Sequence, residues 1–168
     1  ALSTQVASGG CSIVSGGKRN TSSGDLSVVG GGYSNCATFE FSTVGGGESN
    51  QAINYRATIA GGSSNIASGS RSTVGGGRCN TSSNTYSTVS GGYSNLASGA
   101  SSTIAGGHDN TASGDCSTVS GGSGNCASST LSTVGGGGTN CAIHFYTTVA
   151  GGLQNTASNV YATVGGGY

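Results

Sequence analysis

The sequence contains no proline, methionine or tryptophan, and only 6% of its 168 residues are charged. Five basic and five acidic residues are scattered singly, so no basic stripe exists that could neutralise nucleic-acid phosphates or bind an anionic membrane surface. No apolar run is long enough to span a bilayer, and the N-terminus has no signal-peptide pattern. We therefore expect neither nucleic-acid binding nor insertion into a membrane.

Groups that support catalysis or bind metals are equally sparse. The five acidic residues form no cluster suited to acid–base catalysis or calcium binding, and His108 and His144 lie far apart in the sequence. The glycine pairs lack the lysine and following helix of a phosphate-binding loop, and no Cys/His metal spacing occurs. We expect a non-enzymatic protein with no catalytic residue, no metal site and no cofactor.

What is present in abundance is glycine, at 35 residues, arranged in a tandem repeat with the pattern S-T-V-x-G-G-x-x-N-x-A-S-G-x-x. Val or Ile recurs once in every repeat from Val14 to Val164, and a glycine pair follows each one, from Gly16-Gly17 to Gly166-Gly167. The asparagines keep the same phase: Asn20, Asn35, Asn50, Asn65, Asn80, Asn95, Asn110, Asn125, Asn140 and Asn155. A disordered low-complexity tract would not hold this phase, so we expect an ordered repeat protein.

The alternation within one unit predicts which side chains point inward. Ser42 and Val44 alternate with Thr43, and Asn50 lies inward on a second short segment. Each unit is then one coil of two short parallel strands joined by two corners. The fold class is therefore an all-β, single-chain β-solenoid of about eleven coils, with neighbouring coils about 4.8 Å apart and a length of roughly 50 Å.

The two corners are expected to use residues that tolerate a left-handed backbone. The glycine pair would form one corner. The other would be formed by Gly24, Asn54, Gly69, Asn84, Gly99, Gly114 and Asn159. Phe39, Ser129 and His144 stand at the same position and break this rule, so we expect those three corners to turn differently.

The interior is thin, so hydrogen bonds must supply much of the stability. We expect each inward Asn to bond corner backbone groups and neighbouring Asn amides. Asn20 and Asn80 also begin N-x-S/T glycosylation motifs, but their inward position predicts that both stay unmodified.

We expect one repeat domain over 1–168, with a partial first coil at 1–11, regular repeats at 12–167 and no capping segments. Exposed strand edges would then favour pairing with further copies of the chain.

The inward pattern S-x-V-x-G followed by N-x-A-x-G, from about Ser12 to Gly167, resembles two β-roll families. One is the head repeat of trimeric autotransporter adhesins, and the other is the grass type of antifreeze protein. The resemblance implies a left-handed β-roll. It leaves open whether the outer surface serves a surface fibre or ice binding.

The most regular outward feature is a threonine ladder, defined as Thr43, Thr58, Thr73, Thr88, Thr103, Thr118, Thr133, Thr148 and Thr163. It runs beside small residues from Gly45 to Gly165, so the strip is flat, and it is similar to the ice-binding faces of solenoid antifreeze proteins. Threonine also favours strands and pairs well with itself, so a purely structural role is the alternative. The other flank is bulky and mixed, and aromatic residues collect near the corners, where they could pack neighbouring rods.

Cys126 and Cys141 are one coil apart in the same column, so a disulfide between them is possible. Cys11, Cys36, Cys79 and Cys116 have no cysteine in an adjacent coil and would either stay free or link chains.

Our leading hypothesis is a repeat segment of an extracellular or cell-surface fibre or adhesin-like stalk, with copies of itself as partner. The alternative is an ice-binding protein that uses the threonine ladder.

Overall fold

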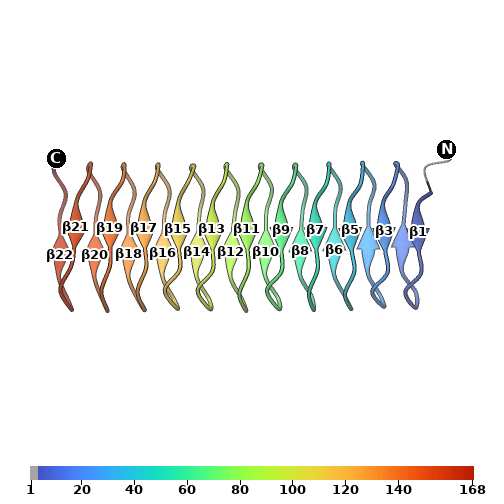
Figure 1. The fold of residues 1–168 in the computed structure, drawn as a ribbon, viewed down its shortest axis with the longest axis horizontal. Coiled ribbons are helices and arrows are strands. Elements are labelled where there is room, and N and C mark those ends of the chain that lie inside the picture. The colour runs from blue at the N-terminus through green and yellow to red at the C-terminus, as the bar shows by residue number, and fades with distance from the viewer. Residues whose placement is uncertain (1–3) are drawn as a thin grey trace.

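The computed structural model describes residues 4–168, which form a straight stack of coils built from two parallel sheets of eleven strands each (Figure 1). The first sheet contains β1 (Val6–Ala7), β3 (Thr21–Ser22), β5 (Cys36–Ala37), β7 (Gln51–Ala52), β9 (Ile66–Ala67), β11 (Thr81–Ser82), β13 (Leu96–Ala97), β15 (Thr111–Ala112), β17 (Cys126–Ala127), β19 (Cys141–Ala142) and β21 (Thr156–Ala157). The second contains β2 (Ile13–Val14), β4 (Val28–Val29), β6 (Thr43–Val44), β8 (Thr58–Ile59), β10 (Thr73–Val74), β12 (Thr88–Val89), β14 (Thr103–Ile104), β16 (Thr118–Val119), β18 (Thr133–Val134), β20 (Thr148–Val149) and β22 (Thr163–Val164). The predicted all-β solenoid, with two short strands per coil, is confirmed.

The register between coils follows the sequence repeat throughout both sheets. In the second sheet Thr73 lies opposite Thr88 and Val74 opposite Val89. Each side chain therefore lies beside the equivalent side chain of the next coil, which is the neighbour relationship that gives sheets most of their side-chain stabilisation. A one-residue slip would turn every valine outward, so the alternating pattern holds the register in place.

The core is a double row of small apolar side chains. Val or Ile from the second sheet faces Ala from the first, and together with Ala57 these make eighteen apolar residues that are at most 1% exposed, from Val29 to Ala157. Serines share the interior with them, for example Ser42 and Ser87. So little apolar area per coil means that the ladders of hydrogen bonds between coils carry much of the stability.

The glycine-pair corner turns as expected. The second glycine of each pair is left-handed, as at Gly47 with φ 90°, where an added Cβ would collide with the carbonyl oxygen of Gly62. Two residues on, Ser49 is left-handed as well, with φ 56°. The corner stacks on itself through single parallel bridges from Lys18↔Tyr33 to Gly138↔Leu153.

At the opposite corner, the predicted position of the left-handed backbone is wrong. None of the predicted corner residues, Gly24 to Asn159, has a left-handed φ; that conformation falls two positions later, at Leu26, Phe41, Arg56 and their counterparts. The corner is closed by a backbone hydrogen bond that any residue can accept, whether from Ser27 to Gly24 at 3.2 Å or from Ser42 to Phe39 at 3.0 Å.

The three exceptional corners therefore turn in the same way as the rest. Ser132 donates its backbone N–H to Ser129 at 3.1 Å, and Thr147 donates to His144 at 3.3 Å. The left-handed position is exposed in every coil from Leu26 to Tyr161. Its side chain meets solvent rather than backbone, so the column accepts large residues.

Candidate functional site

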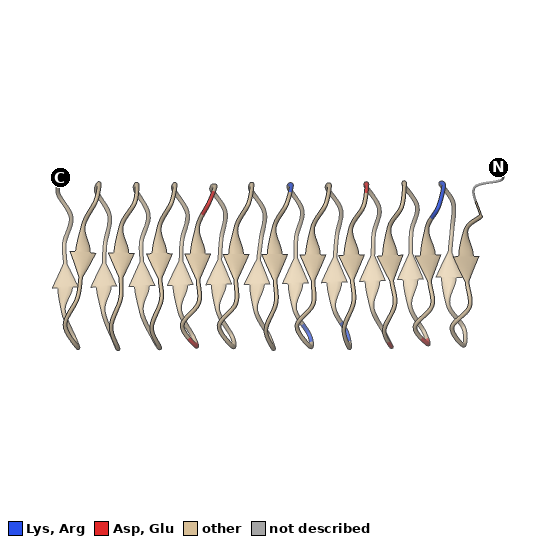
Figure 2. Cartoon of the chain, viewed as in Figure 1, with Lys and Arg blue, Asp and Glu red and all other residues tan. Residues whose placement is uncertain are grey.

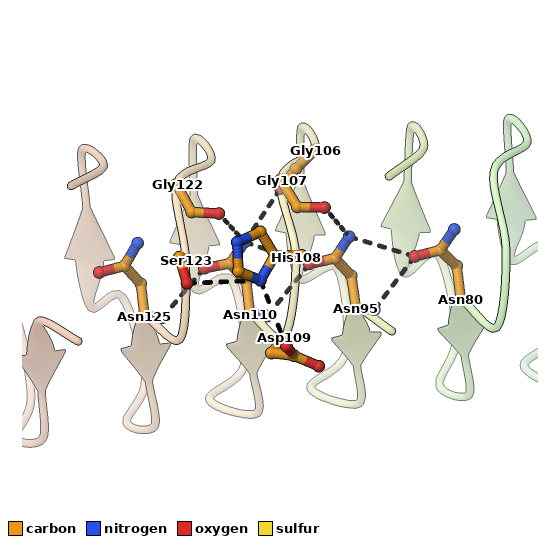
Figure 3. Close-up of polar contacts among 10 residues, drawn as sticks. All are labelled: Asn80, Asn95, Gly106, Gly107, His108, Asp109, Asn110, Gly122, Ser123 and Asn125. Atoms are coloured by element: carbon orange, nitrogen blue, oxygen red, sulfur yellow. Dashed lines mark hydrogen bonds and ion pairs between the residues drawn. The ribbon is translucent and has the colours of Figure 1, made fainter. Parts of the chain in front are cut away.

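The inward asparagines form a continuous ladder along the first corner (Figure 3). Asn95 shows the pattern: its Nδ2 donates to the carbonyl oxygen of Gly91 at 3.0 Å and of Gly107 at 2.9 Å. Its Oδ1 accepts the backbone N–H of Asn110 at 3.1 Å. The same two glycine contacts recur from Asn20 to Asn155, and all but Asn155 are fully buried. Each amide thus ties its own corner to the corner and strand of the next coil.

Because both ends of each amide are occupied, the ladder offers no open site for a ligand. The same burial makes the asparagines of the two glycosylation motifs inaccessible. Asn20 and Asn80 are 0% exposed, and their Nδ2 atoms donate to Gly16 and Gly32 and to Gly76 and Gly92 respectively. An enzyme that attaches a glycan would have to open the coil to reach either amide.

The threonine ladder lies on the outer face of the second sheet, with neighbouring threonines in register, as in Thr103↔Thr118. The members from Thr43 to Thr148 are half-buried, and the flanking residues, such as Gly45 and Ala105, are exposed and small. In the first coils the same column holds Ile13 and Val28 instead. The threonine column is therefore regular over nine coils, with small residues on one side and an exposed column that includes Phe41 and Tyr86 on the other.

The charged residues are confined to the two corners of the coil (Figure 2). One corner carries Lys18, Arg19, Glu48, Arg78 and Asp109, and the other carries Asp25, Glu40, Arg56, Arg71 and Asp115. Both sheet faces are thus uncharged, and any electrostatic recognition by this chain must use a corner.

One corner holds a set of side chains that we call the guanidinium–aromatic strip: Phe41, Tyr55, Arg56, Arg71 and Tyr86. The Arg56 guanidinium lies 5.1 Å from the ring centre of Phe41 and 5.0 Å from that of Tyr55. Arg71 lies 5.4 Å from Tyr55 and 5.3 Å from Tyr86. Phe41 and Tyr55 also meet edge to face at 5.9 Å. Each guanidinium is therefore held between two rings.

Sequence reasoning placed the aromatic residues at the corners but missed their pairing with arginine. The signal was available, because Phe41, Arg56, Arg71 and Tyr86 occupy the same position of successive repeats. Arginine also lies against tyrosine at the opposite corner, with Arg19 5.7 Å from the ring centre of Tyr33 and Arg78 6.0 Å from that of Tyr93. Tyr146 stacks on Tyr161 with ring centres 5.0 Å apart.

The cysteines lie near the surface as free thiols. Cys126 and Cys141 are in register on β17 and β19, which are adjacent strands, so their side chains are neighbours. Burial raises the pKa of Cys126, and the nearby Cys141 raises it further. Burial likewise raises the pKa of Cys36.

The histidines belong to no catalytic arrangement within residues 4–168. His108 lies at an exposed corner, with Nδ1 3.2 Å from the Asp109 carboxylate and 3.4 Å from the Ser123 hydroxyl (Figure 3). His144 accepts the backbone N–H of Phe145 at 3.0 Å.

Over the described part of the chain there is no cavity and no cluster of three or more metal-binding side chains. No helix capable of crossing a membrane occurs there either.

Regular coils, a buried amide ladder and uncharged faces define a β-solenoid repeat protein. A family model, described as the ubiquitous surface protein adhesin repeat, matches residues 87–99 and 102–114. Each match covers most of one coil, the first including β12 and β13 and the second β14 and β15. No curated protein matches the chain. The chain thus resembles the repeats of trimeric autotransporter adhesins, and its outward columns are where it can differ from them.

Proposed function

We propose that this chain is a non-enzymatic structural rod, a repeat segment of an extracellular or cell-surface fibre or adhesin-like stalk. The observation that carries the proposal is the unbroken repeat-to-repeat register of both sheets, reinforced by the asparagine ladder. Such a stack resists bending, because every coil is bonded to the next along both sheets and along the glycine-pair corner. The match of two coils to an adhesin repeat supports the same function.

Copies of the chain would associate end to end or side by side. All coils present nearly the same donors and acceptors along the axis, so a coil of one copy could stack on a coil of another through the contacts used within the rod. Exposed aromatic residues at the corners, such as Tyr146 and Tyr161, would provide lateral contacts.

Negative-stain imaging of the purified chain at neutral pH tests this proposal. Filaments or bundles several rod lengths long are expected, with one rod measuring roughly 50 Å. A field of isolated rods, unchanged as protein concentration rises, would contradict it.

Ice binding by the threonine ladder is a second candidate, and the regular register of that column favours it. The in-register threonines lie beside a column of exposed small residues over nine coils, so ordered water could lie against that strip. The test is thermal hysteresis of the wild type and of Thr103→Tyr, which places a large ring in the middle of the strip. Loss of activity in the variant supports the ladder, whereas absent or unchanged activity removes it.

A further inference from the structure

The guanidinium–aromatic strip is positively charged and has no partner within the rod. Across residues 4–168 the only ion pair is between His108 and Asp109, so neither Arg56 nor Arg71 pairs with a carboxylate. Glu40 is close in the chain fold, because its carbonyl oxygen accepts the backbone N–H of Arg56 at 3.1 Å, but its side chain makes no ion pair with that arginine. Asp25, Glu40 and Asp115 lie at the same corner, but none of them forms an ion pair with either arginine, so both guanidinium groups are free to bind an anionic ligand.

The rings hold the two guanidinium groups in place. Arg56 stacks against Phe41 and Tyr55, and Arg71 against Tyr55 and Tyr86. A guanidinium that lies against a ring can still donate through its planar N–H edge, whose geometry fits the two oxygens of a carboxylate or sulfate. Both arginines occupy the same column in consecutive coils, about 4.8 Å apart along the rod. One anionic group can therefore be reached by both.

The ends of the strip are aromatic and exposed. Phe41 is 37% exposed and Tyr86 is 55% exposed, and they flank the arginine pair on either side along the rod. A sugar ring has apolar C–H faces and polar edges, so it can lie against an aromatic ring while its acidic substituent meets the guanidinium. Two charges are too few for the repeated phosphate contacts that nucleic acid requires, and an acidic peptide without aromatic residues brings no ring to stack.

We propose that this strip binds an acidic saccharide, a sugar carrying a carboxylate or sulfate group, with Arg56 and Arg71 holding the anion and Phe41 or Tyr86 stacking on the ring. Such a site would give the adhesin-like rod a partner, and in that respect it rests on the proposed function. The binding is a property of the single rod, so it can be measured without any filament.

The experiment is calorimetric titration of the purified chain with three oligosaccharides: oligogalacturonate, which carries carboxylates, a heparin-derived oligosaccharide, which also carries sulfates, and neutral maltohexaose. The test variant is Arg56→Gln with Arg71→Gln. Its matched control is Arg19→Gln with Arg78→Gln, which removes the same charge from the opposite corner. A further variant, Arg56→Lys with Arg71→Lys, keeps the charge but loses the planar fork. Circular dichroism checks that all three variants fold.

The proposal predicts binding of at least one acidic oligosaccharide and none of maltohexaose. The test variant should weaken binding by about tenfold or more, the lysine variant should weaken it less, and the control should not change it. Tyr86→Ser, which introduces the residue found in the same column at Ser101, should weaken it as well. No binding of either acidic oligosaccharide, equal losses in the test and control variants, or tighter binding of an acidic peptide or of DNA would each overturn the proposal. Such a result would leave the imaging of filaments unaffected, so the two proposals fail separately.

Discussion

Two hydrogen bonds join Asn95 to Asn110 inside the rod: the backbone N–H and the Nδ2 of Asn110 both donate to the Oδ1 of Asn95, each at 3.1 Å. The same carboxamide of Asn95 donates through its Nδ2 to Gly91, Gly107 and the Oδ1 of Asn80. One side chain thereby connects three successive coils. Because Asn80, Asn95 and Asn110 are buried, losing the amide would leave polar groups such as the backbone N–H of Asn110 without partners.

Asn95→Ala should therefore destabilise the rod by about 2–4 kcal/mol, since buried groups left without partners cost about 1–3 kcal/mol each. Thermal unfolding followed by circular dichroism measures the effect. Asn159→Ala is the control, because Asn159 is exposed at the opposite corner, and its effect should stay within about 0.5 kcal/mol. Equal losses in the two variants would show that the ladder does not stabilise the coils.

The two residues of a glycine pair should differ in how well they tolerate a side chain. At Gly47 the φ of 90° and the nearby carbonyl oxygen of Gly62 leave no room for a side chain, whereas a Cβ at Gly46 would have nothing within 4 Å. Gly47→Ala should cost about 1–3 kcal/mol or more, and Gly46→Ala should be neutral or slightly stabilising. Urea unfolding of both variants measures this. A loss at Gly46 as large as that at Gly47 would contradict the corner geometry.

The inward serine column contains hydroxyls of two kinds. The buried Oγ of Ser102 has no hydrogen-bond partner, while that of Ser87 donates to the carbonyl oxygen of Asn84 at 2.6 Å and lies 2.7 Å from the Ser82 hydroxyl. Alanine already occupies this column at Ala57. Ser102→Ala should raise stability by about 1 kcal/mol, and Ser87→Ala should lower it by about 1–3 kcal/mol. The prediction fails if both substitutions destabilise equally in thermal unfolding.

The adjacent pair Cys126 and Cys141 should form a disulfide under mild oxidation. Diamide accepts the two electrons and two protons that the thiols lose, so the intact mass of a monomeric chain should fall by two hydrogens. Cys141→Ser removes one partner from the same register position and should abolish the change. A mass loss that persists in Cys141→Ser would point to a different pair.

Because the pKa of Cys36 is raised, the pH dependence of its alkylation should differ between the folded and the unfolded chain. Burial disfavours the thiolate, so at any pH near the ordinary thiol range the folded chain holds less Cys36 thiolate than the unfolded chain. Alkylation of Cys36 by iodoacetamide should be slower in the folded protein than in urea, and its rate should keep rising at pH values where the unfolded rate has levelled off. Mass spectrometry of the peptide that contains Cys36 gives both rates. Superimposable pH profiles would contradict the expected effect of burial.

The inside of this rod was predictable almost residue by residue, because the alternation within strands and the constant repeat between coils leave one consistent arrangement of Ser42, Val44 and Asn50. The second corner was not. Gly24 and Asn54 suggested a left-handed backbone, but the structure places that conformation at Leu26 and Arg56, whose exposed side chains meet no backbone of the neighbouring coils.

Contacts on the outer surface were also beyond sequence reasoning. The spacing of Arg56 and Arg71 puts them in one column, but whether a flexible arginine stacks on a ring or extends into water depends on side-chain rotamers, which periodicity does not determine. Those outward columns are where the repeat varies most.

In an assembled fibre we expect coils to stack in one continuous direction, from one chain to the next. X-ray diffraction from aligned filaments of the purified chain measures this stacking. We expect a strong reflection at about 4.8 Å along the filament axis, because coil spacing continues through every chain and across every junction. Filaments whose reflection at about 4.8 Å lies perpendicular to the axis, or a preparation that contains only single rods, would contradict it.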